Sequence, residues 1–487
     1  MGNVSLQRKA ASGIVWTALQ NYSTMFIQFV SGIILARLLT PYDYGCIGML
    51  TVFMVLAEAF IDGGFGSALI QKKRPTQEDY STIFWWNMIM SFSMYFILFC
   101  CAPYIARFYS IPLLSDVLRV QGIILFIYAF NVVQRNQLRK KLDFRVLSIV
   151  TIVTSLLALG ITIILAYKGC GVWALVVQNI VTSLIPAVVF WFYVKWRPIL
   201  VFSKDSFREL FGFGFYMFLT HLINSFSQQV QGLLIGKVYS PSTMGYYSKA
   251  LSTEKLASTS ISRVMTQVTY PLYAEVQDDR QSLVGIIKRL TSIIAYVSFP
   301  LLFILLLIAR PLFVLLYSDV WIQSVPYFRV LCIAGLAVCL QSINLQTISA
   351  IGKSNVMFVW TLVKRTVGLF AILSGLFLFG MNGLLVGVVI NSWFSFFVNI
   401  VLVSKYIGYK WTRQLIDLLP FLVVSILAAV VSYWGGCLFH VNMYVVAVIE
   451  LIIYSIIYIG WSIVFKPEPY SFLIERIKRV RNNSLKD

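Results

Sequence analysis

The chain has 487 residues, of which 59% are hydrophobic and 15% aromatic, and its mean hydropathy is +0.82. These values lie well above those of soluble proteins and exclude a water-soluble globular domain. The formal net charge is +20, but the cations stand in short segments between apolar runs, which argues against nucleic-acid binding. The seven cysteines are scattered without a C-x-x-C pair, so we expect small buried apolar side chains rather than a disulfide or metal framework.

Apolar runs of about 20 residues recur along the chain, each long enough to cross a bilayer as a helix. They predict an all-α polytopic membrane protein with about fourteen transmembrane helices. An even number of spans places both termini on the same side of the membrane. In chain order the predicted spans cover residues 12–36, 44–70, 80–106, 116–134, 146–167, 171–194, 211–237, 243–270, 289–317, 326–350, 355–379, 383–404, 414–437 and 442–465.

Lysine and arginine gather in alternate connections between the predicted spans, whereas the intervening connections hold one or none. This alternation follows the positive-inside rule, so we expect both termini in the cytoplasm. The basic residues in these connections and in the tail are Lys72, Lys73, Arg74, Arg135, Arg139, Lys140, Lys141, Arg145, Lys195, Arg197, Lys204, Arg208, Arg280, Lys288, Arg289, Lys405, Lys410, Arg413, Lys466, Arg476, Lys478, Arg479 and Arg481.

The chain contains an internal repeat, since residues 16–45 align without a gap over residues 216–245 with seven identities in thirty positions. Six predicted spans separate the copies, so both enter the membrane in the same direction, a plan found in secondary transporters. We expect two six-helix lobes (1–205 and 206–405), two additional helices (406–465) and a basic cytoplasmic tail (466–487). The identical pairs are Leu19/Leu219, Phe26/Phe226, Gln28/Gln228, Val30/Val230, Gly32/Gly232, Pro41/Pro241 and Gly45/Gly245.

The first and seventh predicted helices each carry a polar stripe at helical spacing, and the two stripes align in the repeat. Polar groups facing lipid would be costly, so the stripes should face protein or water. A water-filled central cavity between two symmetric lobes explains both stripes, and interhelical hydrogen bonding is the alternative. The stripe residues are Asn21, Thr24, Gln28 and Ser31 in the first helix and His221, Asn224, Gln228 and Gln231 in the seventh.

The eighth predicted helix carries three basic residues inside the membrane, where ionisable groups are usually functional or paired. Lys249 and Arg263 are fourteen residues apart, almost four turns, and therefore share one face. Lys255 lies on a different face beside Glu254. An ion pair of Lys255 with Glu254 or with another acid is the alternative to a functional role for Lys255.

The eleventh predicted helix carries two adjacent cations, Lys364 and Arg365, roughly 13 Å from its cytoplasmic end and so close to the bilayer centre. A single lysine near the end of a helix can extend its ammonium to the interface, but two adjacent cations at this depth cannot both do so. We therefore expect a cationic cavity wall. Such a wall indicates an anionic substrate.

The second predicted helix carries two acids one turn apart, Glu58 and Asp62, which would pair with cavity cations or bind a coupling H⁺ or Na⁺. Gly63, Gly64 and Gly66 follow and would allow close packing or a break in the helix. No catalytic triad, H-E-x-x-H motif or nucleotide-binding loop occurs, so we expect neither an enzyme nor a metal ion or other cofactor.

Five segments taken together resemble the polysaccharide-transporter branch of the MOP exporter superfamily, whose members include Wzx-type flippases and which is related to the MATE transporters. The resemblance covers essentially residues 5–405, and the last two helices carry little signature. The segments are ARLLTPYDYG (36–45), DGGFGSALIQ (62–71), QLRKKLDFR (137–145), GVWALVVQ (171–178) and GKVYSPSTMGYYSKA (236–250).

The resemblance implies a flippase that moves an undecaprenyl-diphosphate-linked oligosaccharide across the bacterial inner membrane by alternating access, for O-antigen, capsule or exopolysaccharide biosynthesis. A polysaccharide polymerase and glycosyltransferases would be its partners. The five membrane cations would then supply counter-charge to the diphosphate, and the polar stripes would hydrate the glycan. The membrane potential would drive export, with or without an H⁺ or Na⁺ gradient acting through Glu58 or Asp62.

Three alternatives stay open at this point. A multidrug antiporter of the MATE family has the same two-lobe plan, but cationic drugs call for acids rather than cations in the cavity. A peptidoglycan lipid II flippase shares the cationic cavity, although the five segments fit the polysaccharide branch better. A membrane scaffold for glycan assembly predicts that reversing the charges of Lys364 and Arg365 leaves export intact.

Overall fold

The structure, a computed structural model, describes residues 2–275, 279–351, 354–439, 441–472 and 474–475. Within these residues every regular element is a helix, which confirms the all-α class. Contacts divide the chain into two compact units, Met1–Ser248 and Lys249–Asp487, and the division falls inside helix α10 (Pro241–Glu275). The expected lobe bounds at residues 205 and 206 stay a prediction.

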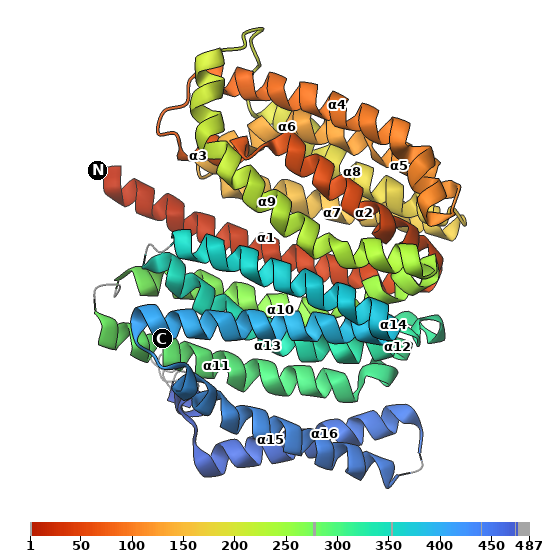
Figure 1. The fold of residues 1–487 in the computed structure, drawn as a ribbon, viewed down its shortest axis with the longest axis vertical. Helices are drawn as coiled ribbons and strands as arrows, with labels where there is room; N and C mark the ends of the chain where they lie inside the picture. The colour runs from red at the N-terminus through yellow and green to blue at the C-terminus, as the bar shows by residue number, and fades with distance from the viewer. Residues whose placement is uncertain (1, 276–278, 352–353, 440, 473, 476–487) are drawn as a thin grey trace, which may run out of the picture. The chain divides into compact units, whose positions relative to one another are not determined.

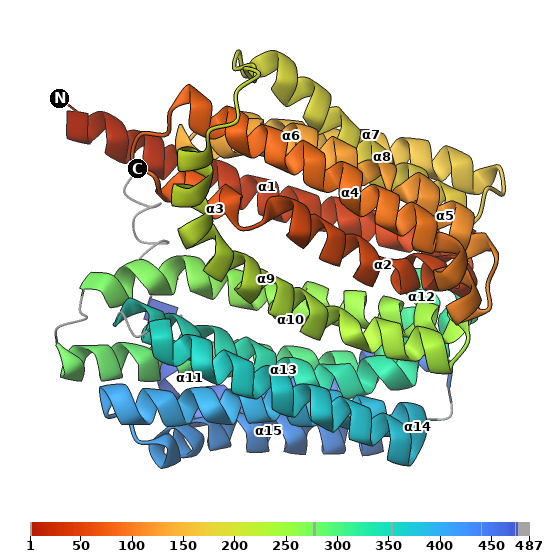
Figure 2. The same ribbon diagram turned by 45° about the horizontal axis from the view of Figure 1, so that its top comes forward.

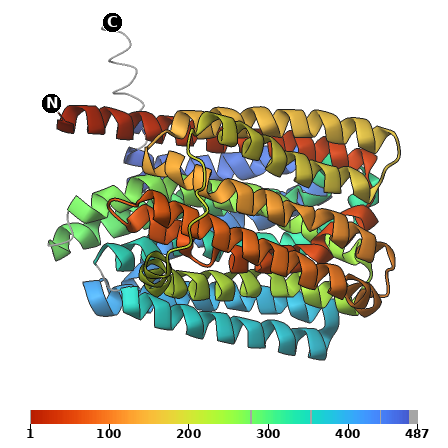
Figure 3. The same cartoon turned by 90° about the horizontal axis from the view of Figure 1, so that it is seen from above.

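The first unit is built from long helices that pack side by side (Figure 1). In it, α1 lies along α7, as the view from above also shows (Figure 3), while α4, α6 and α8 form one layer and α9 packs on α2 and α3. Its helices before α10 are α1 (Gly2–Leu38), α2 (Pro41–Asp62), α3 (Phe65–Gln71), α4 (Gln77–Tyr109), α5 (Leu113–Gln121), α6 (Ile123–Lys140), α7 (Phe144–Tyr167), α8 (Val172–Tyr193) and α9 (Lys204–Val238).

The second unit continues from α10 and pairs its helices as antiparallel neighbours. Helix α13 lies against α14 and α11 (Figure 2), and α15 against α16. Its further helices are α11 (Arg280–Leu307), α12 (Ala309–Tyr317), the 3₁₀ turn η1 (Asp319–Trp321), α13 (Ser324–Ala350), α14 (Ser354–Ile407), α15 (Trp411–Cys437) and α16 (Met443–Phe465).

Helix α14 is two antiparallel helices joined at Gly380, whose φ of 61° and ψ of −140° suit glycine alone. The halves pack so closely that a Cβ on Gly375 would lie 2.1 Å from the carbonyl oxygen of Gly383. Small residues at such a crossing let two membrane helices approach backbone to backbone. The break agrees with the predicted spans 355–379 and 383–404.

Ten helical segments within the described residues are long and apolar enough to cross a membrane, and α14 counts once among them. The chain is therefore a multi-pass membrane protein. Helices α1, α9 and α10 are not among the ten; they correspond to the first, seventh and eighth predicted spans, which carry the polar stripes and the first three cations. The count of about fourteen spans stays a prediction.

The two copies of the repeat end and restart their helices at equivalent positions: α1 ends at Leu38 and α2 starts at Pro41, while α9 ends at Val238 and α10 starts at Pro241. Each restart is capped by a hydroxyl, since Thr40 Oγ1 accepts from the Asp43 N–H at 3.4 Å and Ser240 Oγ accepts from the Thr243 N–H at 3.2 Å. The repeat therefore preserves a local helix–turn–helix structure.

The helix starts of the two copies also touch each other, within the first unit. A Cβ on Gly45 would lie 1.8 Å from the Pro241 carbonyl oxygen, and a Cβ on Gly245 would lie 1.8 Å from the Pro41 carbonyl oxygen. The contact is reciprocal, so α2 and the start of α10 cross with no room for a side chain. This crossing gives a physical reason for the Pro41/Pro241 and Gly45/Gly245 identities.

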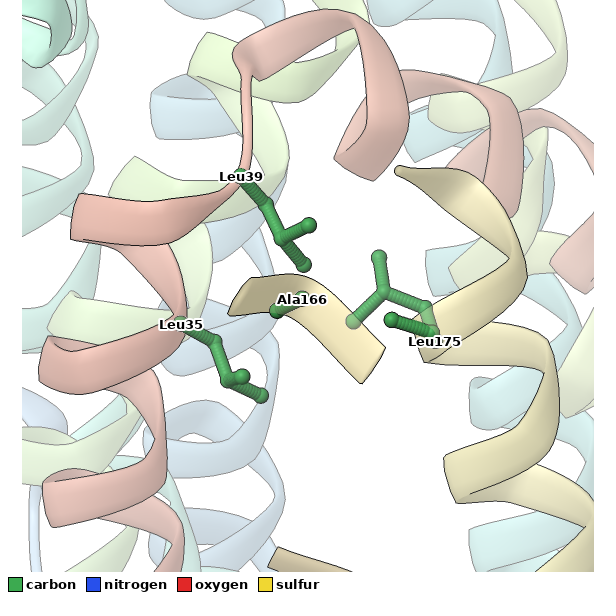
Figure 4. Packing of buried hydrophobic residues seen from close by; sticks show 5 residues of the cluster. Leu35, Leu39, Ala166 and Leu175 are labelled. Atoms are coloured by element: carbon green, nitrogen blue, oxygen red, sulfur yellow. The ribbon is translucent and has the colours of Figure 1, made fainter. Parts of the chain in front are cut away.

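A small apolar core holds the turn between α1 and α2 (Figure 4). Leu35 and Leu39 approach Ala166 of α7 and Leu175 of α8, and all four are buried. Burying a leucine side chain stabilises by about 1.5–3 kcal/mol. The cluster therefore fixes the first copy of the repeat against α7 and α8.

The glycines after Asp62 both break a helix and permit close packing, as expected. Gly63 (φ 53°) and Gly64 (φ 75°) separate α2 from α3 in the left-handed region. A Cβ on Gly64 would lie 2.0 Å from the carbonyl oxygen of Gly214 in α9. Gly64 requires glycine because both its backbone conformation and its contact with α9 exclude a side chain.

The prediction that cysteines are buried holds only in part. Cys46, Cys332 and Cys339 are buried, whereas Cys100 and Cys437 are exposed. An apolar side chain on a membrane helix can face lipid as readily as protein, so hydrophobicity alone does not predict burial here.

The basic connection between the fourth and fifth predicted spans is partly helical, which corrects its reading as a loop: α6 extends to Lys140. The Lys140 ammonium donates to the carbonyl oxygens of Leu69 at 3.0 Å and Ile70 at 3.3 Å, at the C-terminus of α3. A cation there satisfies carbonyl groups that the helix leaves without partners. Lys140 therefore has a structural role.

Lys72, just after α3, joins two carboxylates. Its ammonium lies 3.0 Å from Asp79 of α4 and 2.8 Å from Glu209 of α9. Desolvation favours the neutral amine, but the hydrogen bonds to Glu209 and Asp79 outweigh it and raise the pKa of Lys72. This bridge fixes the end of α3 to its neighbours in the first unit.

Candidate functional site

Lys249 lies buried among aromatic side chains of the second unit. Its ammonium is 4.0 Å from the centroid of the Tyr317 ring and 5.6 Å from that of Trp321. The Tyr317 hydroxyl also lies 3.1 Å from Thr253 Oγ1, one turn along α10. Aromatic faces stabilise a cation away from bulk water. Sequence reasoning missed these rings, because no local pattern relates α10 to α12.

Lys255 and its neighbour Glu254 separate to different environments. The Lys255 side chain is exposed, whereas Glu254 is buried and accepts a hydrogen bond from Ser258. The Glu254 carboxylate also crowds α13, since a Cβ on Gly335 would lie 2.2 Å from its oxygen. No ion pair joins Lys255 and Glu254 in the described part of the chain.

Lys364 is buried and its Nζ donates to Oδ1 of Asn399 at 2.9 Å, across the two halves of α14. A neutral amide holds this ammonium in place without neutralising it. Arg365, the next residue, is half-buried. The sequence analysis missed Asn399, although an asparagine within the apolar run FFVNIVLV is itself a signal of a polar contact.

Arg263, the fifth predicted cation, lies in α10, but its side chain is outside the part of the chain that the structure describes. The four cations that are described all belong to the second unit. They differ in surroundings: Lys249 is surrounded by aromatic rings, Lys364 is held by an amide, and Lys255 and Arg365 are more accessible. The accessible pair is therefore the better candidate for direct contact with an anion.

The two predicted acids belong to the first unit. Glu58 lies in the field of Arg135 from α6, a residue that the sequence analysis had assigned to a loop. Tyr128, also on α6, lies in the field of both Glu58 and Asp62. These acids therefore face a partly charged surface of α6 inside the first unit.

Asp62 closes the break between α2 and α3. Its carboxylate accepts the backbone N–H groups of Gly64 and Gly66, and a Cβ on Gly66 would lie 2.8 Å from its Oδ1. His221 of the α9 stripe and Arg139 also act on it electrostatically. Asp62 thus stabilises the start of α3 and also interacts electrostatically with His221 and Arg139.

The polar stripes of α1 and α9 resemble each other in which of their residues form hydrogen bonds and which are exposed. At their C-terminal positions, Ser31 receives a hydrogen bond from Gln178 at 3.4 Å, and Gln231 accepts one from Tyr247. Gln28 and Gln228, at equivalent positions in the repeat, are both exposed. The C-terminal end of each stripe therefore forms hydrogen bonds between helices, which was the alternative to a water-filled cavity. The middle of each stripe is exposed.

The remaining stripe residues lie at intermediate depth except one. Asn21, Thr24 and Asn224 are half-buried, and the Thr24 hydroxyl donates to the Gln20 carbonyl oxygen at 2.7 Å within α1. His221 is exposed. In the described residues no group of three His, Cys, Asp or Glu side chains is close enough to hold a metal ion.

The sequence of the chain is similar to those of proteins named for polysaccharide synthesis. The chain is 25% identical over 358 residues to the teichuronic acid biosynthesis protein TuaB of Bacillus subtilis, which covers 73% of this chain and 74% of TuaB. It is 22% identical over 440 residues to the lipopolysaccharide biosynthesis protein WzxC of Escherichia coli, which covers 89% of each chain.

Among solved structures, the lipid II flippase MurJ in an inward closed conformation matches with a TM-score of 0.75 at 13% identity. The match covers 95% of this chain and all of MurJ, so the two chains share a fold. The family model described as "Polysaccharide biosynthesis protein" matches residues 34–326, more than half of the chain. This chain is therefore a member of the polysaccharide biosynthesis protein family.

Proposed function

We propose that the protein is a flippase that moves an anionic undecaprenyl-diphosphate-linked oligosaccharide across the bacterial inner membrane by alternating access, for surface polysaccharide synthesis. The names of TuaB and WzxC support a role in polysaccharide synthesis. The observation that carries the anionic substrate is that Lys255 is exposed and Arg365 half-buried in the second unit, because accessible cations on membrane helices can supply counter-charge to an anion.

The membrane potential supplies a driving force for outward movement. Two negative charges that cross the whole field at about 100 mV release roughly 4–5 kcal/mol. A diphosphate cannot enter hydrocarbon without counter-charge, because desolvating an ion costs far more than this. The proposed role of Lys255 and Arg365 is to supply that counter-charge while the prenyl tail stays in lipid.

Deletion of the gene tests the function directly. We expect a null strain to accumulate a lipid-linked repeat unit on the cytoplasmic face of the inner membrane, because synthesis continues while translocation stops. Mass spectrometry of the lipid extract identifies the glycan, and protease- or lectin-protection of spheroplasts reports its leaflet. Normal surface polysaccharide without accumulation would contradict the proposal, as would accumulation on the outer face.

We further propose that Glu58 or Asp62 binds a coupling ion. Both acids lie among titratable groups of the first unit, and Asp62 sits at a helix break. If they couple transport to an ion gradient, Glu58→Gln with Asp62→Asn makes transport in proteoliposomes insensitive to H⁺ and Na⁺ gradients. Wild-type transport that already ignores both gradients would contradict coupling, as would a double variant that keeps the dependence.

The proposed orientation places both termini in the cytoplasm, which follows from the basic connections. A polysaccharide polymerase and glycosyltransferases are the proposed partners, because the substrate must be built on one side and consumed on the other. A cationic drug is a poor substrate for this chain, since the described cations Lys249, Lys255, Lys364 and Arg365 would repel it.

A further inference from the structure

A cleft of about 510 Å³ lies in the first unit between α1 and the connection from α6 to α7, whereas the four cations described above belong to the second unit. The segment QLRKKLDFR (137–145) supplies its basic side, and the proposed contacts with the transported substrate do not use Lys141 or Arg145. The cleft is lined by Ser12, Gly13, Trp16, Lys141, Leu142, Asp143, Phe144 and Arg145.

Two cations face the cleft. Lys141 and Arg145 are exposed, and neither forms an ion pair with a described residue. The Arg145 guanidinium lies 5.6 Å from the centroid of the Trp16 ring, an arrangement that orients it while leaving its N–H groups available. The cleft therefore contains two cationic side chains, Lys141 and Arg145, beside the ring of Trp16.

The acid in the cleft is already used by the fold. Asp143 Oδ1 caps α7 by accepting the Val146 N–H at 3.5 Å, and its Oδ2 accepts the Tyr193 hydroxyl at 3.0 Å. A carboxylate at a helix N-terminus is also balanced by the helix dipole. The electrostatic character of the cleft is consequently set by Lys141 and Arg145.

The backbone holds the cations in a fixed geometry. Leu142 has φ 58°, a left-handed conformation that costs a non-glycine residue about 1–2 kcal/mol. The Asp143 N–H bonds to the Leu138 carbonyl oxygen at 3.0 Å, so the turn is closed. On the other wall, a Cβ on Gly13 would lie 2.7 Å from the Phe144 ring. The cleft is thus a shaped site on packed helices.

We propose that this cleft binds the phosphate-bearing headgroup of a membrane lipid at the cytoplasmic interface. Arg145 and Lys141 would bind phosphate oxygens, and Trp16 would lie at the level of the headgroups, where tryptophan is favoured. The headgroup belongs either to a prenyl diphosphate, which includes the proposed transport substrate, or to an anionic phospholipid. Both lipids carry the phosphate oxygens that Lys141 and Arg145 would bind.

Native mass spectrometry of the full-length protein in detergent tests the site, with farnesyl diphosphate and phosphatidylglycerol titrated separately. Lys141→Gln with Arg145→Gln is the test variant. The control, Lys73→Gln with Arg74→Gln, removes the same charge from two exposed residues in the connection from α3 to α4. We expect the test variant to bind at least one probe about tenfold more weakly than the control, because charge-assisted contacts are lost.

The same comparison in a Lys255→Gln and Arg365→Gln background separates this cleft from the proposed transport site. Weaker binding of farnesyl diphosphate alone assigns the cleft to prenyl diphosphates, and weaker binding of phosphatidylglycerol alone assigns it to phospholipid. Loss of both indicates a general phosphate site. Test and control variants that bind both probes equally, with unchanged melting temperatures, would overturn the proposal while leaving the proposed flippase activity untouched.

Discussion

Replacing Lys255 and Arg365 together with glutamine is expected to lower the translocation rate of the lipid-linked oligosaccharide at least about tenfold. Hydrogen bonds to charged groups contribute about 1.5–3 kcal/mol each, and about 1.4 kcal/mol corresponds to a factor of ten. Lys255 is exposed and Arg365 half-buried, so both side chains can reach a diphosphate without breaking the packing around Lys249 or Lys364.

The measurement is translocation of a lipid-linked oligosaccharide in proteoliposomes, beside surface polysaccharide in a complemented null strain. Lys255→Arg with Arg365→Lys keeps both charges and should keep most of the rate. Lys73→Gln with Arg74→Gln controls for the change in net charge. A glutamine variant that transports at the wild-type rate would remove these two residues from the substrate path.

Gly45→Ala and Gly245→Ala should each destabilise the protein by about 3 kcal/mol or more, because overpacking at a rigid contact typically costs about 1–3 kcal/mol and here the obstacle is backbone. Each new Cβ would lie 1.8 Å from a proline carbonyl oxygen, at Pro241 or Pro41 respectively. Neither carbonyl can rotate away, since both belong to helices. The two variants should behave alike because the contact is reciprocal.

Thermal unfolding of the detergent-solubilised variants measures this effect. Gly160→Ala in α7 is the matched control, since a Cβ there meets no atom within 4 Å. It should leave the melting temperature unchanged or raise it, because alanine is favoured over glycine in a helix by about 1 kcal/mol. If Gly45→Ala unfolds at the same temperature as Gly160→Ala, the close crossing of α2 and α10 is wrong.

Hydrophobicity predicted the all-α class, while the orientation that loop charge predicts stays a prediction. The all-α class follows from apolar runs of membrane length, and the break after Asp62 follows from its glycines. The gaps between the predicted spans, at 37–43 and 238–242, contain the helix restarts at Pro41 and Pro241. These features are local or repeat at a fixed offset, so a single sequence contains them. The helical end of α6 was missed, because positive charge marks a membrane boundary without revealing where the helix stops.

The surroundings of the candidate site needed the tertiary structure. Lys364 and Asn399 are 35 residues apart, and Thr253 and Tyr317 are 64 apart, so no helical period relates either pair. By itself the sequence determined which residues are charged, which segments are long and apolar enough to cross a membrane, and which positions repeat. Only the tertiary structure decided that Lys249 meets aromatic rings while Lys255 is exposed. The physical reason is that periodicity sets the face of one helix, whereas partners depend on how helices cross.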